Sequence, residues 1–222
     1  RFGFLGRVER DKGVFLLLEA FRDACAKDAT GHQRLVFAGE GDDLAALRAQ
    51  VQAFGLAEQV QFTGRLTHAQ VPDYLASLDA LVAPTLITEP FGIVAVEAAA
   101  AGIPVFASRI GGLAETVEHE STGLVLPAGD LDTLSRALLR GMQNPTWLAG
   151  LGSNGRERAL KTYAWPVITD RFEELFDSIS QKENTSSIPR NGVGSISDAV
   201  ESPLPGKTVS SRQSVRPPSR RS

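Results

Sequence analysis

The scarcest reactive residue in this sequence of 222 residues is cysteine, because Cys25 is the only one. A single cysteine excludes an internal disulfide framework and a metal site built from a cysteine cluster. The three histidines, His32, His68 and His119, are far apart and show no His-x-x-x-His spacing. We therefore expect exposed histidines and no bound metal, and we interpret Cys25 as a small hydrophobic residue on a helix.

Long apolar runs and an excess of one charge are also missing. No run of about 18 apolar residues is present, so no membrane span is predicted. The net charge of −3 gives no chain-wide preference for nucleic acid or another polyanion. We expect a protein of the cytoplasm or of the cytosolic face of a membrane. The chain opens at Arg1 and runs directly into an apolar segment, and we read it as a fragment whose N-terminal part is missing.

Short apolar segments, most of them followed by glycine or proline, alternate with segments of helical periodicity. The alternation predicts a parallel sheet covered by helices on both faces, an α/β, Rossmann-like doubly wound fold. We expect this domain over residues 1–180, followed by a disordered tail rich in Ser, Pro and Arg over 181–222. The expected strands are 2–6, 34–39, 59–63, 79–83, 105–107 and 123–126, and the expected helices are 14–29, 42–54, 67–78, 90–101, 130–141, 154–162 and 165–179.

The stretch 88–108 organises the predicted site. Glu89 lies just before a helix that we expect to begin at Pro90 and to stop at Gly102, and Glu97 lies about two turns inside this helix. A helix N-terminus offers unpaired N–H groups to a phosphate, and carboxylates accept hydrogen bonds from the hydroxyls of a sugar or ribose. The stretch therefore predicts a nucleotide-sugar site.

Further charged residues follow the carboxyl ends of the predicted strands. Arg7 and Lys12 follow the first strand, and Glu40 follows the second. Ligands of doubly wound sheets bind beyond these strand ends, so we expect the charged residues and Glu89 to converge on one edge. Taken alone, Arg7 and Lys12 are more typical of a solvated charged loop, and Glu97 of an exposed helix face.

In the order of its motifs, the sequence over 2–179 resembles the C-terminal, donor-binding half of retaining glycosyltransferases of the GT-B fold, the large group sometimes called family four. The motifs that carry the resemblance are Gly6-Arg-Val8 with Lys12-Gly13, Gly39-Glu-Gly41, Val60-Gln-Phe-Thr-Gly64, Glu89-Pro-Phe-Gly92, Glu97-Ala98, Gly102-Ile-Pro-Val105, Gly111-Gly112 with Glu115, and Gly123-Leu124.

The resemblance implies a role for each matched residue. Arg7 and Lys12 would bind the donor diphosphate and stabilise the charge of the leaving group, and Glu89 would contact the transferred sugar near its anomeric centre. Glu97 would bind the ribose hydroxyls, with Glu115 as a supporting partner of the site or a surface residue. The other residues that would contact the nucleotide, its phosphates or its sugar are Gly39, Gly41, Arg65, Phe91, Gly92 and Ile93.

The reaction implied is transfer of a sugar from a nucleotide diphosphate sugar to an acceptor hydroxyl, with retention of the anomeric configuration and without a metal or other cofactor. The acceptor would be a carbohydrate, a lipid or another hydroxyl compound. Members of the family have a further N-terminal domain that supplies acceptor contacts, and this chain departs from them because it has no room for one. We therefore expect the chain alone to be inactive or weakly active.

Two other interpretations stay open. One is a non-catalytic nucleotide-sugar-binding or regulatory module of the same fold, because a fold does not determine a function. A degenerate module is expected to have lost Arg7, Lys12 or Glu89, and all three are present. The other is a related enzyme such as a sugar-nucleotide epimerase or a phosphorylase. A phosphorylase would need a cofactor-binding lysine, for which the sequence offers no local support.

Overall fold

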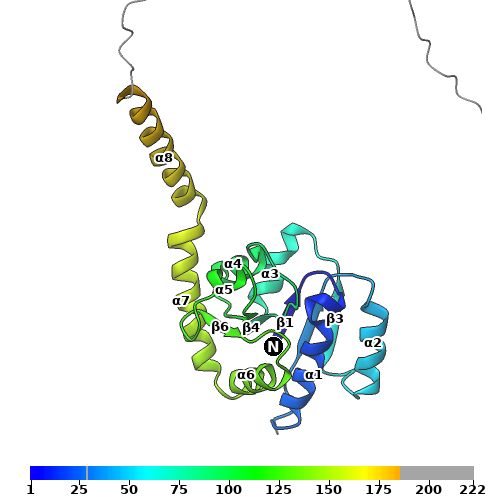
Figure 1. Cartoon of the computed structure of the whole chain (residues 1–222). Helices are drawn as coiled ribbons and strands as arrows, with labels where there is room; N and C mark the ends of the chain where they lie inside the picture. Colours follow the sequence, from blue (N-terminus) through cyan, green and yellow to red (C-terminus); the bar gives the residue numbers. More distant parts are fainter. Residues whose placement is uncertain (29, 186–222) are drawn as a thin grey trace, which may run out of the picture. The chain divides into compact units, whose positions relative to one another are not determined.

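The computed structural model describes residues 1–28 and 30–185, and its centre is one parallel sheet (Figure 1). The described strands are β1 (Phe2–Leu5), β2 (Leu35–Ala38), β3 (Val60–Gly64), β4 (Ala80–Ala83), β5 (Val105–Ser108) and β6 (Gly123–Leu126). Their order is β3-β2-β1-β4-β5-β6, and every pairing is parallel. The Rossmann-like α/β fold predicted from the sequence is confirmed. The order reverses between β1 and β4, which is where sheets of this kind open to a ligand.

Helices cover both faces of the sheet because successive strand residues point to opposite sides. In β2, Phe37 belongs to one buried cluster and Val36 to the other. The first cluster is covered by α1 (Val14–Cys25), α2 (Leu44–Ala53) and α6 (Leu131–Gln143), and the second by α3 (Val71–Ala76), α4 (Ile93–Ala100) and α5 (Leu113–Thr116). Figure 1 shows α3, α4 and α5 on one side of the strands and α1 and α6 on the other.

The helix that carries the predicted site begins later than the sequence suggests. We expected it to start at Pro90, but α4 starts at Ile93. The residue before it, Gly92, has φ 77° and ψ 53°, a left-handed conformation that a helix cannot include. Residues 89–91 are therefore a loop, and Glu89 lies four positions before the helix. The end of the helix is as predicted, because Ala101 caps it and Gly102 follows with φ 80°.

Helix α7 (Pro145–Tyr163) is longer than the predicted helix 154–162. Glycines at 150 and 152 lower the helix propensity of its first half. Gly152 is buried against the end of α4, where a β-carbon would lie 2.0 Å from the carbonyl oxygen of Gly102. Close packing between two helices therefore explains this glycine, and the contact overrides the weak local propensity.

The last described helix crosses the expected domain boundary. Residues Arg1–Asp177 form one compact unit. Helix α8 (Trp165–Thr185) is the predicted last helix, extended beyond 179, and the boundary expected at 180 falls inside it. The tail predicted for 181–222 lies outside the described residues from 186 onward, and there it stays a prediction. Two one-turn 3-10 helices, Arg10–Lys12 and His68–Gln70, complete the described elements.

The packing of α7 yields a stability prediction with a built-in control. Gly152→Ala should lower the free energy of unfolding by about 1–3 kcal/mol, because the new methyl group collides with backbone. Gly150 is exposed, and a β-carbon added there would have no other atom within 4 Å. Gly150→Ala should therefore raise the free energy of unfolding by up to about 1 kcal/mol. Urea denaturation of both variants measures the difference. Equal effects of the two substitutions would contradict the helix contact.

Candidate active site

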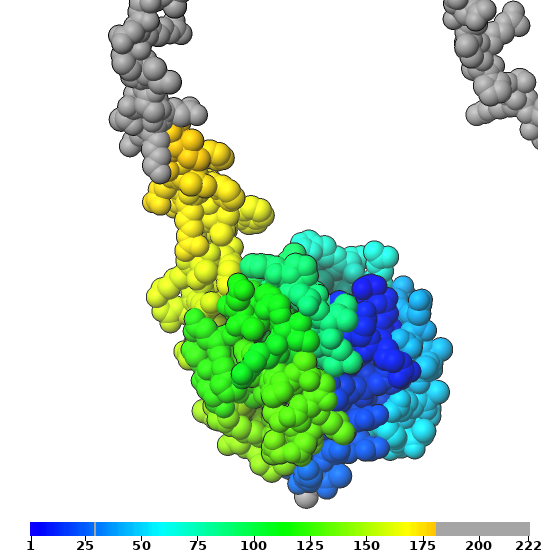
Figure 2. Space-filling view, in the orientation of Figure 1, coloured from blue at the N-terminus to red at the C-terminus, as the bar shows by residue number. Residues whose placement is uncertain are grey.

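A pocket of about 430 Å³ opens at the carboxyl ends of β1 and β4. This volume lies in the range of small-molecule sites. The described residues that line it come from the end of β1 and its loop, the loop after β4, the start of α4, and α5: Phe4, Leu5, Gly6, Arg7, Lys12, Ala83, Pro84, Thr85, Glu89, Pro90, Phe91, Gly92, Ile93, Val94 and Leu113. In Figure 2 the N-terminal segment in blue meets the blue-green segment that precedes α4 at the surface. The convergence of the two loops predicted from the sequence is confirmed.

An ion pair joins the two loops across the pocket. Lys12 Nζ lies 2.5 Å from Glu89 Oε1, and the side chains are only 16% and 28% exposed. Partial burial limits screening by water, so this pair interacts more strongly than an open surface pair. The cation predicted to bind a diphosphate and the carboxylate predicted to bind a sugar therefore contact each other.

Backbone contacts hold the first loop in place. Gly13 follows Lys12 with φ 73°, and a β-carbon there would lie 2.0 Å from the carbonyl oxygen of Pro84. Leu86 N–H donates to the carbonyl of Asp11 at 2.8 Å. The loop after β1 is thereby fixed to the loop after β4, and Lys12 stands at their junction.

Arg7 occupies the rim of the pocket. Its side chain is 62% exposed, and its guanidinium pairs with Glu9 at 2.7 Å. The side chain lines the pocket, as predicted, but its ion pair is with Glu9 and not with Glu89. Arg7 therefore adds an exposed positive charge at the rim, whereas Lys12 supplies a partly buried one in the wall.

The N-terminus of α4 supplies the third positive feature. The first N–H groups of an α-helix have no acceptor within the helix and carry the positive end of its dipole. Phe91, Gly92 and Ile93 all line the pocket at this end, and Phe91 and Ile93 are 45% and 65% exposed. An anionic group in the pocket would meet both this helix end and Lys12.

Four residues that the resemblance places at the nucleotide are not among the described residues that line the pocket: Gly39, Gly41, Arg65 and Glu97. A β-carbon on Gly39 would lie 1.8 Å from the carbonyl oxygen of Gly6, and one on Gly41 would lie 2.4 Å from that of Val8. These glycines therefore let the loop after β2 lie against the loop after β1, and their proposed ligand contacts stay predictions.

Arg65 and Glu97 lie farther from the pocket wall. Arg65 is exposed after β3, which is separated from β1 by β2. Glu97 is half-buried one turn beyond Ile93 on α4 and forms no ion pair with any described residue. Glu97 therefore lies on the helix whose N-terminus lines the pocket, and its ribose contact stays a prediction.

Thr85 and Leu113 also line the pocket, and neither was predicted from the sequence. Thr85 is 4% exposed, and its hydroxyl lies 3.1 Å from the carbonyl oxygen of Ile87. Leu113 packs on Gly92, where a β-carbon would lie 2.5 Å from its side chain. Neither residue stands at a spacing that marks a site, so only their contacts reveal them. Gly112, from the Gly111-Gly112 motif, lies against the loop of Glu89, because its N–H donates to the Glu89 carbonyl at 2.8 Å.

The residues scarce in the sequence lie outside the pocket. His32, His68 and His119 are exposed, as predicted. Among residues 1–28 and 30–185, no group of three His, Cys, Asp or Glu side chains could hold a metal ion. Cys25 is half-buried beside the core, and burial, with a smaller contribution from Asp28, raises its pKa to about 11. None of the described helices is long and apolar enough to cross a membrane.

Comparison with known proteins shows to which family this chain belongs. The model of the family "Glycosyl transferases group 1" matches residues 1–158. This chain is a member of the group 1 glycosyltransferases. It is 33% identical over 180 residues to a phosphatidyl-myo-inositol mannosyltransferase of Mycobacterium leprae, an alignment that covers 80% of the chain and 46% of the relative.

The names of two further matches state a donor or a bound nucleotide. A GDP-mannose-dependent alpha-(1-6)-phosphatidylinositol monomannoside mannosyltransferase of Mycolicibacterium smegmatis is 32% identical over 77% of this chain and 46% of its own length. The crystal structure of Anabaena Alr3699/HepE in complex with UDP and glucose matches with a TM-score of 0.70 and 26% identity, covering 80% of this chain and 48% of that one. This glycosyltransferase chain thus spans about half the length of the relatives it matches.

The partly buried position of the Lys12–Glu89 pair can be tested with a double-mutant cycle. Lys12→Met, Glu89→Gln and the double variant should show a coupling free energy of about 1 kcal/mol in urea denaturation, because each single variant leaves a partner unpaired. The matched control is the pair of Lys161 and Glu157 on α7, whose side chains are 73% and 65% exposed. Its coupling should be clearly smaller, and a coupling for Lys12 and Glu89 no larger than the control would refute their interaction.

Proposed function

We propose that this chain is the donor-binding part of a retaining glycosyltransferase and that its pocket binds a nucleotide diphosphate sugar. The observation that carries the proposal is the meeting of Lys12, Glu89 and the N-terminus of α4 around one pocket at the switch point of the sheet. A phosphate suits the lysine and the helix end, and sugar hydroxyls suit the carboxylate.

Binding of the donor exchanges the partners of the ion pair. Without donor, Lys12 and Glu89 neutralise each other. With donor bound, Lys12 turns to the diphosphate, and Glu89 accepts hydrogen bonds from the transferred sugar. Each charged group thus keeps a partner in both states, which avoids an unpaired charge in a partly buried site.

Transfer requires that negative charge on the departing diphosphate be stabilised. The bond from the anomeric carbon to the phosphate oxygen breaks, and the acceptor oxygen bonds to the same face of that carbon. The nucleoside diphosphate leaves with the bonding electron pair, and the acceptor's proton leaves with it. Lys12, Arg7 and the α4 N-terminus stabilise this charge because all three already line the pocket before the reaction begins. We propose that they make a divalent metal unnecessary.

The related proteins suggest the class of donor. Alr3699/HepE was crystallised with UDP and glucose, and the Mycolicibacterium relative is described as GDP-mannose-dependent. We propose a UDP-hexose or a GDP-hexose as the donor of this chain. The acceptor would be a carbohydrate, a lipid or another hydroxyl compound.

We propose that the acceptor is bound by a further, N-terminal domain of the same protein. The matched relatives are about twice as long as the aligned part. Helix α8 also presents large apolar side chains to solvent, among them Trp165 at 82%, Phe172 at 54% and Phe176 at 62% exposure. Such a face suits contact with another folded part of a protein.

Nucleotide binding tests the proposal directly. Titration calorimetry of the 222-residue chain with UDP-glucose, GDP-mannose and ADP-glucose should show binding, with a preference for one base, that persists in EDTA.

Lys12→Ala should weaken binding of the donor. Lys12→Ala and Arg7→Ala should each lower turnover of the complete glycosyltransferase by on the order of 10²-fold. Lys161→Ala, which removes an exposed lysine from α7, is the control. Normal turnover in both variants would exclude the diphosphate role.

Glu97 offers a separate test of the nucleotide's placement. Glu97→Ala should raise the dissociation constant of the donor more than it lowers kcat, as expected for a contact made equally in the ground state and the transition state. Comparison of the intact donor with its nucleoside diphosphate measures whether the lost contact is to the nucleotide. A decrease confined to kcat would argue against a ribose contact.

A further inference from the structure

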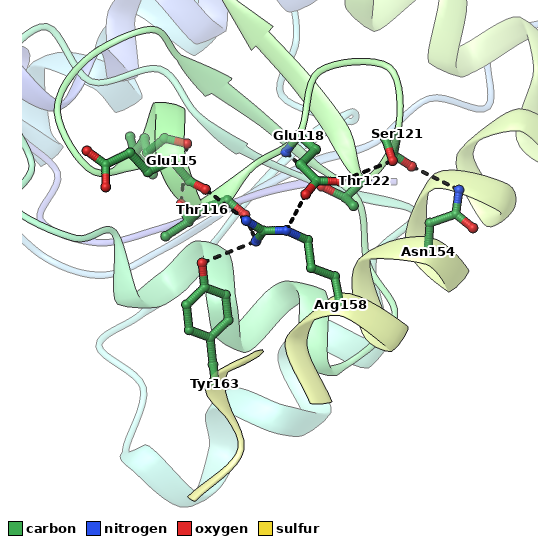
Figure 3. A network of polar contacts seen from close by, with 9 residues as sticks. Glu115, Thr116, Glu118, Ser121, Thr122, Asn154, Arg158 and Tyr163 are labelled. Carbon is green, nitrogen blue, oxygen red and sulfur yellow. Dashed lines mark hydrogen bonds and ion pairs between the residues drawn. The ribbon is translucent and has the colours of Figure 1, made fainter. Parts of the chain in front are cut away.

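The side chain of Arg158, on α7, holds the end of helix α5 (Figure 3). Its guanidinium donates to the carbonyl of Thr116 at 2.9 Å and to that of Glu115 at 3.1 Å. It also pairs with Glu118 at 2.6 Å. The last carbonyls of a helix have no donor within the helix, so Arg158 supplies donors that α5 lacks.

The same guanidinium reaches the aromatic ring that ends α7. One nitrogen of Arg158 donates to the hydroxyl of Tyr163 at 3.1 Å. Burial lowers the pKa of Arg158, but its hydrogen bonds to Tyr163 and Glu118 outweigh burial and raise that pKa above its ordinary value. Arg158 therefore stays charged and able to donate throughout the physiological pH range.

Tyr163 in turn contacts the wall of the pocket. Its ring meets the ring of Phe91 edge to face, with the centroids 5.7 Å apart and the planes at 85°. Phe91 lines the pocket from the loop between β4 and α4, and it is 45% exposed. An edge-to-face contact fixes the orientation of both rings, so Tyr163 restricts the positions that Phe91 can take.

Helix α5 supports the same loop from its other end. Gly112, just before α5, donates its N–H to the carbonyl of Glu89 at 2.8 Å, and a β-carbon on Gly112 would lie 2.5 Å from the α-carbon of Phe91. Leu113, the first residue of α5, lines the pocket. Arg158 therefore acts on residues 89–91 by two routes, through α5 and through Tyr163.

We propose that Arg158 and Tyr163 are positioning residues of the donor pocket, which hold Phe91 and α5 so that the loop before α4 keeps the shape that receives the donor. This inference rests on the proposed function. The loop is neither helix nor strand, and Phe91 is 45% exposed. Contacts from outside the loop must therefore hold it, and a site that is held beforehand binds more tightly because less ordering remains to be done.

The position of Phe91 can be measured without a ligand. With 4-fluorophenylalanine at position 91, the fluorine resonance should shift toward that of the free amino acid in Arg158→Gln and in Tyr163→Leu. Arg158→Lys should shift it too, because an ammonium group cannot replace the planar fork that serves several acceptors. Tyr163→Phe keeps the ring contact and should lie nearer the wild type. The control is Arg136→Gln, which removes an exposed ion pair with Asp132 on α6.

Measurement of donor affinity shows whether the position of Phe91 affects binding in the pocket. In Arg158→Gln and Tyr163→Leu, the dissociation constant for UDP-glucose or GDP-mannose should rise roughly fivefold or more, the scale seen for residues that act through others. Arg136→Gln should bind as the wild type does. Circular dichroism shows whether each variant folds, and Tyr163→Leu tests the proposal if Arg158→Gln does not fold.

The outcomes separate this inference from the proposed function. An unchanged fluorine resonance in folded Arg158→Gln and Tyr163→Leu overturns the positioning role. A shifted resonance with an unchanged dissociation constant for the donor would show that the position of Phe91 does not affect donor binding, and would overturn the proposal. If the wild-type chain binds none of the nucleotide sugars, the proposed function fails, while the fluorine shift still decides whether the two residues position Phe91.

Discussion

The ion pair of Lys12 and Glu89 is the interaction on which the site depends, because it joins two loops whose residues lie 77 positions apart in the sequence. Both loops leave the carboxyl ends of neighbouring strands at the point where the sheet order reverses. At such a point the chain connections run in opposite directions and leave a crevice. The fold thus creates the opening, and the two charged residues give it a chemistry suited to a phosphate beside a sugar.

Glycine makes the walls of this pocket possible. Gly13, Gly39 and Gly112 each stand where a β-carbon would lie within 2.5 Å of backbone atoms from another loop. The first two contacts bring the loop after β1 against the loop after β4 and against the loop after β2. The third brings the turn before α5 against the loop after β4. The ligand contact that the resemblance implies for Gly39 stays a prediction. The glycine-rich motifs therefore serve first to stack loops on one another.

Support for the site extends well beyond its lining residues. Helix α7 lies behind α4 and α5, meets α4 through Gly152 and holds α5 through Arg158. Such a second layer matters because loop residues like Glu89 and Phe91 have no helical or strand hydrogen bonds of their own to hold them. Residues of α7 thereby contribute to the geometry of the loop that carries Glu89 and Phe91.

The sequence by itself determined the alternation of strands and helices, the edge of the sheet that carries the site, and the convergence of the loop of Lys12 and the loop of Glu89 on that edge. Periodicity and strand-end residues are local signals, and a parallel sheet converts them into one edge. Only the tertiary structure decided that α4 begins at Ile93, that α7 extends from Pro145, and that Arg158 and Tyr163 reach the pocket wall. These features depend on contacts between residues distant in sequence, and a local pattern carries no record of the partner that a side chain or a glycine will meet.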